Sequence, residues 1–211
     1  MKALRSRVAC SLENERGMTL IEVVVAITIL AILSTASLGV YLSGINAATA
    51  QQRREVAVTV ANSVLEEATL APAANLLLGR SEAVVTNLRT NNTGIPGVLQ
   101  TYAGFQPPPV AATPVVKPTQ VVPRNGTNYS VNTIIGTCFQ KKAGGTCTVA
   151  ATPATFPTQP AVPSTSVVLT RIIVVVRWDA GSTCNVVPSP CVYQTSTLVD
   201  RNNELTWNVV D

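Results

Sequence analysis

The sequence predicts an α+β fold in which one long N-terminal helix packs on a C-terminal antiparallel β-sheet. Three patterns lead to this prediction: an apolar run near the start, a stretch with helical spacing directly after it, and alternating apolar strands in the last third of the chain. The 211 residues suffice for one domain with an appendage. With 4% aromatic residues, the core is expected to contain few large rings.

Residues 18–43 are predicted to form the transmembrane half of the helix. The run from Thr19 to Leu42 is apolar apart from one carboxylate, Glu22. At about 1.5 Å per residue, a helix of this length reaches roughly 36 Å, enough to cross a hydrocarbon core of about 30 Å. The basic residues at the start of the chain all precede the run, so the positive-inside rule places the N-terminus in the cytoplasm and the rest outside. These residues are Lys2, Arg5, Arg7 and Arg16.

Glu22 is the anomaly of this segment. A carboxylate in a spanning helix costs about 2.5 to 3.5 kcal/mol at the centre and less near an end, so a plain anchor has no reason to retain one. The group needs a positively charged partner. Proteolysis between Gly17 and Met18 would create one, a free amine a single helical turn before Glu22.

Arg16-Gly17 followed by Met18-Thr19-Leu20-Ile21-Glu22-Val23 and a long apolar helix resembles the signature of type IV pilins, minor pilins and type II secretion pseudopilins. The resemblance implies a pilin-like fold and a leader, residues 1–17, that a prepilin peptidase removes after Gly17. It implies that Met18 becomes the N-methylated terminus. It also implies that Glu22, with Thr19 beside it, serves assembly by pairing with the N-terminal amine of a neighbouring subunit.

Other interpretations of the segment stay open. Glu22 would be tolerated as an edge residue whose carboxylate reaches the lipid headgroups. The basic start, the apolar core and the small residues before Ser37 also fit a secretory signal peptide, although the run is long for one and contains Glu22. One departure from many major pilins is Gly39, where they have a proline, so a proline kink is not expected.

Residues 44–78 are predicted to continue the helix as an amphipathic half. Between Arg53 and Leu70 the apolar side chains fall at helical spacing on one stripe. Pro72 marks the predicted end, with a further turn up to Leu78 as an open alternative. The stripe consists of Ala57, Val60, Ala61, Val64, Leu65 and Ala68.

The middle of the chain is rich in proline. Seven prolines lie between Gly94 and Gly126, and four more lie between Ala150 and Thr165. Continuous helix or a central strand is not expected there. Residues 79–127 are therefore predicted to be irregular, and residues 150–165 to form a surface loop.

Residues 128–211 are predicted to form the antiparallel sheet domain. In Ser166–Trp178 the side chains alternate, and the face with Ile172, Val174, Val176 and Trp178 is expected to point into the core. This region loosely resembles the C-terminal part of PilV-like minor pilins and minor pseudopilins over residues 171–199. The other predicted strands are Tyr129–Ile135, Val192–Val199 and Leu205–Val209, the last after a turn at Asp200–Asn203.

The cysteines indicate an oxidising compartment. Cys10 would leave with the leader, and an even number would remain in an exported domain, which favours disulfides. Three pairings are open; the favoured one joins Cys138 to Cys147 and Cys184 to Cys191, because each pair closes a short loop. Zinc is the rival, but the chain has neither a Cys-x-x-Cys motif nor a histidine, so no metal is expected.

Catalysis is not expected. Without histidine there is no Ser-His-Asp or Cys-His machinery, and neither a phosphate-binding glycine motif nor a nucleophile elbow occurs. No cofactor is expected. The net charge of +4 is weak and scattered, so no specific nucleic acid is inferred as a partner.

The sequence is therefore interpreted as a structural filament subunit of the pilin class, a minor pilin or pseudopilin, and not as an enzyme. The resemblance implies as partners other pilin or pseudopilin subunits, the prepilin peptidase, an inner-membrane assembly platform and membrane lipid. The precursor is expected in the inner membrane with a cytoplasmic N-terminus, and the mature protein in a periplasmic or cell-surface filament. The alternative is a membrane-anchored exported binding or adhesin domain that never enters a filament.

Overall fold

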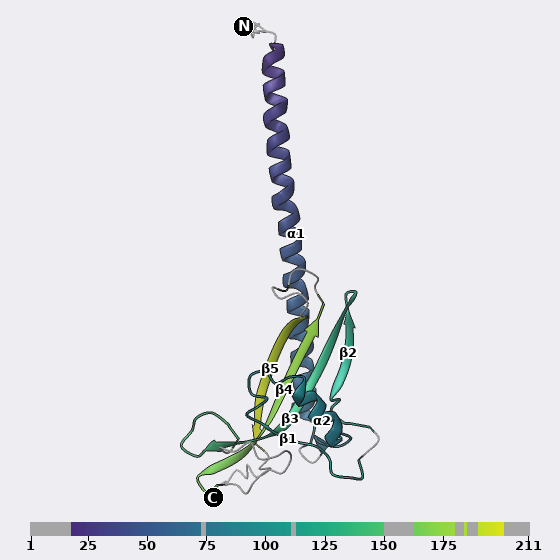
Figure 1. Cartoon of the computed structure of the whole chain (residues 1–211), viewed down its shortest axis with the longest axis vertical. Helices are drawn as coiled ribbons and strands as arrows, with labels where there is room; N and C mark the ends of the chain where they lie inside the picture. The colour runs from purple at the N-terminus through teal and green to yellow at the C-terminus, as the bar shows by residue number, and fades with distance from the viewer. Residues whose placement is uncertain are drawn as a thin grey trace, which may run out of the picture. The chain divides into compact units, whose positions relative to one another are not determined.

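The computed structural model describes residues 18–72, 75–110, 113–149, 163–179, 184 and 190–200 (Figure 1). The chain divides into two compact units, Met1–Ala47 and Ala48–Asp211. The long helix α1, Leu20–Leu70, contributes its first part to one unit and its remainder to the other. The predicted leader, including Cys10 and Gly17, lies outside the described residues.

Helix α1 runs without interruption for 51 residues. No proline precedes Pro72, and the helix ends at Leu70, two residues before it. Residues 75–79 then form a turn instead of a further stretch of α-helix. The prediction of one long N-terminal helix is confirmed.

The second unit contains an antiparallel sheet of five strands in the order β1-β3-β4-β5, with β2 also pairing with β3. Its strands are β1 Tyr102–Ala103, β2 Thr119–Arg124, β3 Thr127–Lys141, β4 Ser166–Trp178 and β5 Cys191–Asp200. Strand β4 has the predicted bounds, whereas β3 continues six residues past the predicted Ile135. The strand predicted at 205–209, the turn residues 201–203 and most of the proline-rich loop lie outside the described residues.

One face of the sheet packs on the second half of α1, as predicted. Five of the six residues of the predicted stripe are buried, and Leu65 is partly buried. They share one core with Ile172, Val174, Val176 and Trp178 of β4. The alanines of the stripe let the helix approach closely, and each valine buried in this way contributes about 1.5 to 3 kcal/mol.

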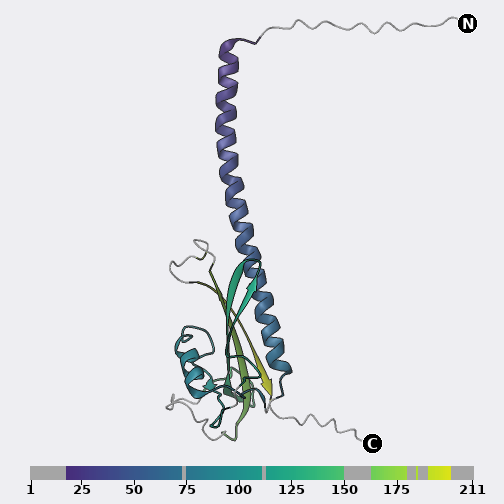
Figure 2. The same ribbon diagram turned by 90° about the vertical axis from the view of Figure 1, so that its right-hand side faces the viewer.

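The opposite face of the sheet is covered as well, which the sequence analysis did not anticipate. Ile173 and Val175 of β4 are buried together with Ile134 and with Val98 from the proline-rich segment. Figure 2 shows α2, Glu82–Thr90, and the last turns of α1 on opposite sides of the sheet. The centre of β4 is therefore apolar on both faces.

Residues 79–127, predicted to be irregular, contain α2, β1 and β2. Helix α2 occupies a stretch without proline, and Pro123 lies in the edge strand β2, where a missing N–H is tolerated. Strands β2 and β3 are joined by Asn125-Gly126, both with positive φ (48° and 73°), as in a two-residue type I′ hairpin turn. This Asn-Gly signal was available in the sequence and was overlooked.

Candidate functional site

The start of α1 is organised by Thr19. The backbone N–H of Glu22 donates to Thr19 Oγ1 at 3.4 Å and to the Thr19 carbonyl at 3.0 Å, and the Val23 N–H donates to the same carbonyl at 3.2 Å. Thr19 is thus the N-cap, and Glu22 is the third residue of the helix. Thr-x-x-Glu is the pattern of a capping box, a signal that the sequence analysis did not use.

Glu22 lies in the first turn of α1, at the positive end of the helix dipole. The first turn of a helix carries a partial positive charge from its unpaired N–H groups, worth about 0.3 to 1 kcal/mol to an acidic side chain. Glu22 is exposed there. The structure therefore gives the carboxylate a local role, which exists in addition to any role in pairing with an amine.

The segment that follows is apolar and exposed. Leu20 and Val40 are 83% and 76% exposed, and the helix is long and apolar enough to cross a membrane by length and composition. Its serine and threonine hydroxyl groups donate to carbonyls three or four residues earlier in the same helix, which makes them compatible with lipid. They belong to Thr28, Ser34, Thr35, Ser37 and Ser43.

Comparison with known proteins identifies this end of the chain. Residues 13–38 match the family model of the prokaryotic N-terminal methylation motif. The chain carries a type IV pilin-like prepilin signal. The matched segment includes Gly17, Met18, Thr19 and Glu22, the residues predicted to serve processing and assembly. No curated protein and no solved structure matches the chain.

The methylation motif bears on the class of protein, its partners and its location. It implies a structural protein rather than an enzyme, and interaction with pilin subunits and a prepilin peptidase in general terms. The motif and the apolar helix fit a precursor anchored in the inner membrane.

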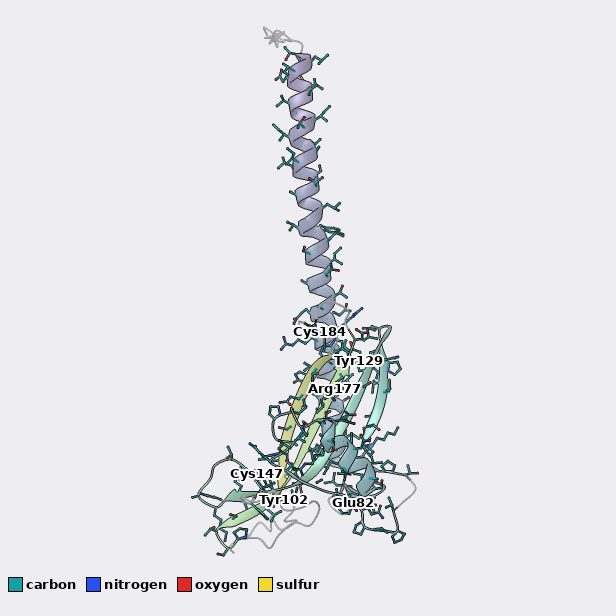
Figure 3. All side chains as sticks on the ribbon, viewed as in Figure 1. Glu82, Tyr102, Tyr129, Cys147, Arg177 and Cys184 are labelled. Atoms are coloured by element: carbon teal, nitrogen blue, oxygen red, sulfur yellow. A yellow bond between two sulfur atoms is a disulfide. The ribbon has the colours of Figure 1, made fainter. Side chains whose placement is uncertain are left out.

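The cysteines of the second unit lie in two pairs at disulfide distance. The Cα atoms are 5.4 Å apart in Cys138–Cys147 and also in Cys184–Cys191. These are the two pairs that the sequence analysis favoured. Figure 3 places Cys147 near Tyr102 at one end of the sheet and Cys184 near Tyr129 at the other. Within the described ranges, no three histidine, cysteine, aspartate or glutamate side chains gather as ligands for a metal ion.

Two buried arginines of the second unit were missed. Arg80 is fully buried and Arg171 is 8% exposed, although Arg171 belongs to the face of β4 that was not expected to form the core. Arg171 donates to the carbonyls of Gly97, Gln100 and Cys147. The position of Arg171 next to alternating valines and isoleucines was a signal that this arginine is buried. Its hydrogen-bond acceptors could not be inferred, because they are distant in sequence.

Proposed function

We propose that the chain is a structural subunit, a minor pilin or pseudopilin, of a type IV pilus or a type II secretion-like filament. In this proposal the precursor is cut after Gly17, the new terminus Met18 is N-methylated, and the mature chain assembles through α1. The observation that carries the proposal is an exposed apolar helix that continues into a folded domain. Its first turn, with Thr19 as N-cap and Glu22 as third residue, lies inside a methylation motif.

The exposed apolar surface needs a partner in every state of the protein. Apolar side chains such as Leu20, Ile27 and Leu30, each more than 60% exposed, gain about 25 cal/mol for each Å² removed from water. A lipid bilayer supplies this cover before assembly, and helices of neighbouring subunits supply it in a filament.

The charge of Glu22 then favours assembly over the isolated subunit. Cleavage creates an amine on Met18, and opposite charges a few ångströms apart attract strongly where water is scarce. An unpaired carboxylate in the same medium is penalised. Pairing between the Glu22 of one subunit and the Met18 amine of the next would relieve that penalty and fix the axial register.

Small residues along α1 support close packing of such helices. Thr35, Gly39, Ser43 and Ala47 follow one another at intervals of four and share one side of the helix. A Cβ added at Gly39 would meet nothing within 4 Å, so nothing in the described chain itself requires glycine there.

The proposed partners and locations follow from this assembly. The precursor would insert in the inner membrane with its N-terminus in the cytoplasm and meet the peptidase and an assembly platform there. The mature subunit would then contact other pilin or pseudopilin subunits in a periplasmic or cell-surface filament.

The competing function is a membrane-anchored exported binding or adhesin domain that stays out of filaments. It is favoured by one observation: the second unit has its own core on both faces of the sheet, so it does not need a filament to be folded.

The deciding experiment is the N-terminal sequence and intact mass of the protein from membranes and from sheared surface material of its host. We expect an N-methylated Met18 in both fractions. A terminus at Ser37 would identify a secreted protein with a discarded signal peptide. An uncut Met1 that is absent from the sheared fraction would identify the membrane-anchored domain.

A further inference from the structure

We infer that Arg171 and the Cys138–Cys147 disulfide form a redox-dependent latch that fastens the cover of the second sheet face. The cover is defined here as residues 95–101, which contribute Ile95 and Val98 to the core on that face. The latch would close when the exported chain is oxidised; the export step rests on the proposed function, whereas the contacts of the latch do not.

Arg171 joins two segments that are far apart in sequence. Its Nη1 donates to the carbonyls of Gly97 and Gln100, at 3.1 and 3.2 Å, and to Thr101 Oγ1 at 3.1 Å. Its Nη2 donates to the carbonyl of Cys147 at 2.6 Å. One side chain of β4 thus ties the cover to the loop that the disulfide closes.

The cover is built to receive this side chain. Gly97 has a φ of +87°, which other residues rarely adopt, and its position lies in ordinary van der Waals contact with the Arg171 side chain, 3.6 Å from a Cβ built there to Cδ and Nη1. Thr101 Oγ1 donates to the Gly97 carbonyl at 2.6 Å and therefore presents its lone pairs to Arg171. On the far side, Arg89 of α2 donates to the Thr101 carbonyl at 2.9 Å, which connects α2 to the same network.

The guanidinium depends on these acceptors. Burial lowers the pKa of Arg171, and the carbonyl and hydroxyl oxygens around it replace the water that the charge has lost. Because the strongest contact by distance is the one to Cys147, a displacement of that carbonyl leaves a buried charge with fewer acceptors.

The disulfide determines where that carbonyl lies. Cys138 is part of β3, in register with Leu169 of β4, and Cys147 is buried beside it. Thr148, directly after the second cysteine, also pairs with Phe139 of β3 in an isolated bridge. In the reduced chain, this bridge and the Gln140 side chain, which donates to the Gly145 carbonyl at 2.7 Å, are left to hold the Cys147 carbonyl on Arg171.

The redox step is ordinary thiol–disulfide exchange. The thiols of Cys138 and Cys147 lose two protons and two electrons as the S–S bond forms, and a disulfide of an oxidising exchange protein accepts both and becomes a dithiol. Cytosolic thiols stay reduced, whereas exported ones are oxidised. The latch would thus close after translocation.

Amide hydrogen exchange on the full chain in detergent tests the latch. The variant Cys138→Ser/Cys147→Ser is compared with Cys184→Ser/Cys191→Ser, whose pair lies at the other end of the sheet (Figure 3). We expect exchange in residues 95–101 to be faster by about tenfold or more in the first variant and unchanged in the second. Equal exchange in the first variant and the wild type would overturn the inference.

A second variant keeps the test decisive if the first one does not fold. Arg171→Met retains the disulfide, and we expect both faster exchange in residues 95–101 and about tenfold faster reduction of Cys138–Cys147 by a phosphine, because the Cys147 loop loses its attachment. Wild-type reduction and exchange rates in Arg171→Met would refute the latch. Neither readout depends on cleavage or filament assembly, so this outcome is separate from that of the proposed function.

Discussion

Arg80 donates from Nη2 to the carbonyl oxygen of Thr133 at a distance of 2.6 Å, inside a gap in the hydrogen bonding of β3. Thr133 faces Pro118, because the adjacent pair in the ladder is Thr119 with Asn132. The Thr133 N–H donates to the Pro118 carbonyl at 2.8 Å, but proline has no N–H to return. The guanidinium supplies the missing donor.

The Arg80 side chain also binds the segment that leads into β2. Nη1 of Arg80 donates to the Val116 carbonyl at 3.2 Å, whereas Nε has no hydrogen-bond acceptor among the described residues. Burial lowers the pKa of Arg80 to about 10, which leaves the guanidinium charged at neutral pH. A fully buried cation is retained here because it replaces a backbone donor that the sequence cannot provide.

Replacing Arg80 should therefore lower the stability of the fold, and a second substitution should restore part of the lost stability. Arg80→Met leaves two buried carbonyls without this donor, and we expect the free energy of unfolding to fall by about 3 kcal/mol. Adding Pro118→Ala restores a backbone N–H opposite Thr133 and should recover about 1 kcal/mol. Urea unfolding of the full chain in detergent, followed by circular dichroism, measures both changes.

Pro123→Ala is the matched control for this rescue. Position 123 lies an odd number of residues from 118 in the same antiparallel ladder, so its N–H would point away from β3. If Pro118→Ala and Pro123→Ala restored the same free energy of unfolding in the Arg80→Met background, the claim that Arg80 replaces the backbone N–H missing at Pro118 would be contradicted.

Glu22→Gln separates the two roles of the first turn of α1. Glutamine serves a capping box as well as glutamate does but carries no charge. If charge pairing drives assembly, both Glu22→Gln and Glu22→Ala should abolish the sheared filament fraction and leave membrane insertion intact. Normal filaments from Glu22→Gln would show that Glu22 acts only in capping the helix. In that case Thr19→Val, which removes the cap without altering the charge, should be the variant that fails to assemble.

Gly39→Leu tests close packing along the small-residue side of α1. The space around Gly39 is open in the described chain, and leucine favours helix over glycine by about 1 kcal/mol, so insertion and folding should be unaffected. We expect incorporation into filaments to fall at least severalfold, as measured by immunoblotting of sheared and membrane fractions. Val40→Leu, at an adjacent exposed position, is the control and should assemble normally.

Tyr129→Phe tests the attachment of α1 to the sheet. The Tyr129 hydroxyl donates to the Arg53 carbonyl at 3.2 Å, and its loss should cost about 1 kcal/mol of stability at neutral pH. Burial raises the pKa of Tyr129, although the nearby Arg53 charge opposes this rise. Tyr193→Phe, in a half-buried tyrosine of β5, is the control.

The raised pKa of Tyr129 gives its contribution a definite pH dependence. The folded state binds the proton more tightly than the unfolded state, so the stabilisation is fully present below a pH of about 10 and is lost as pH rises through the folded pKa. Unfolding midpoints between pH 8 and roughly 11.5 should therefore fall less steeply in Tyr129→Phe than in the wild type. Parallel pH profiles would contradict this assignment.

The long elements were predictable because their patterns repeat many times. The stripe from Ala57 to Ala68 and the alternation in Ser166–Trp178 each extend over several periods, and both were assigned to the correct core face. The predicted strand ended at Ile135, directly before Gly136, whereas β3 continues to Lys141. In the structure that glycine permits close approach: a Cβ there would overlap the Tyr102 carbonyl of β1.

The cover of the second face was not predictable by the same means. It depends on individual contacts between segments that are distant in sequence, such as those of Arg171 with Gly97 and Gln100, and these leave no periodic pattern in the sequence. The residues proposed for processing and assembly are the opposite case, since Gly17, Met18 and Glu22 lie within one short motif that can be recognised without any structure.

The serine and threonine side chains between Leu20 and Ala47 of α1 all donate their hydroxyl protons to their own backbone. Because these hydroxyls are already bonded within the helix, they need no hydrogen bonds to the surroundings that must be broken when those surroundings change. In the proposed filament, extraction from the bilayer would exchange one apolar medium for another at little desolvation cost. Glu22 is the exception, because its carboxylate gains a partner only among protein subunits. Only the first turn would then favour the filament over the bilayer, while the rest of the segment would have nearly the same free energy in both.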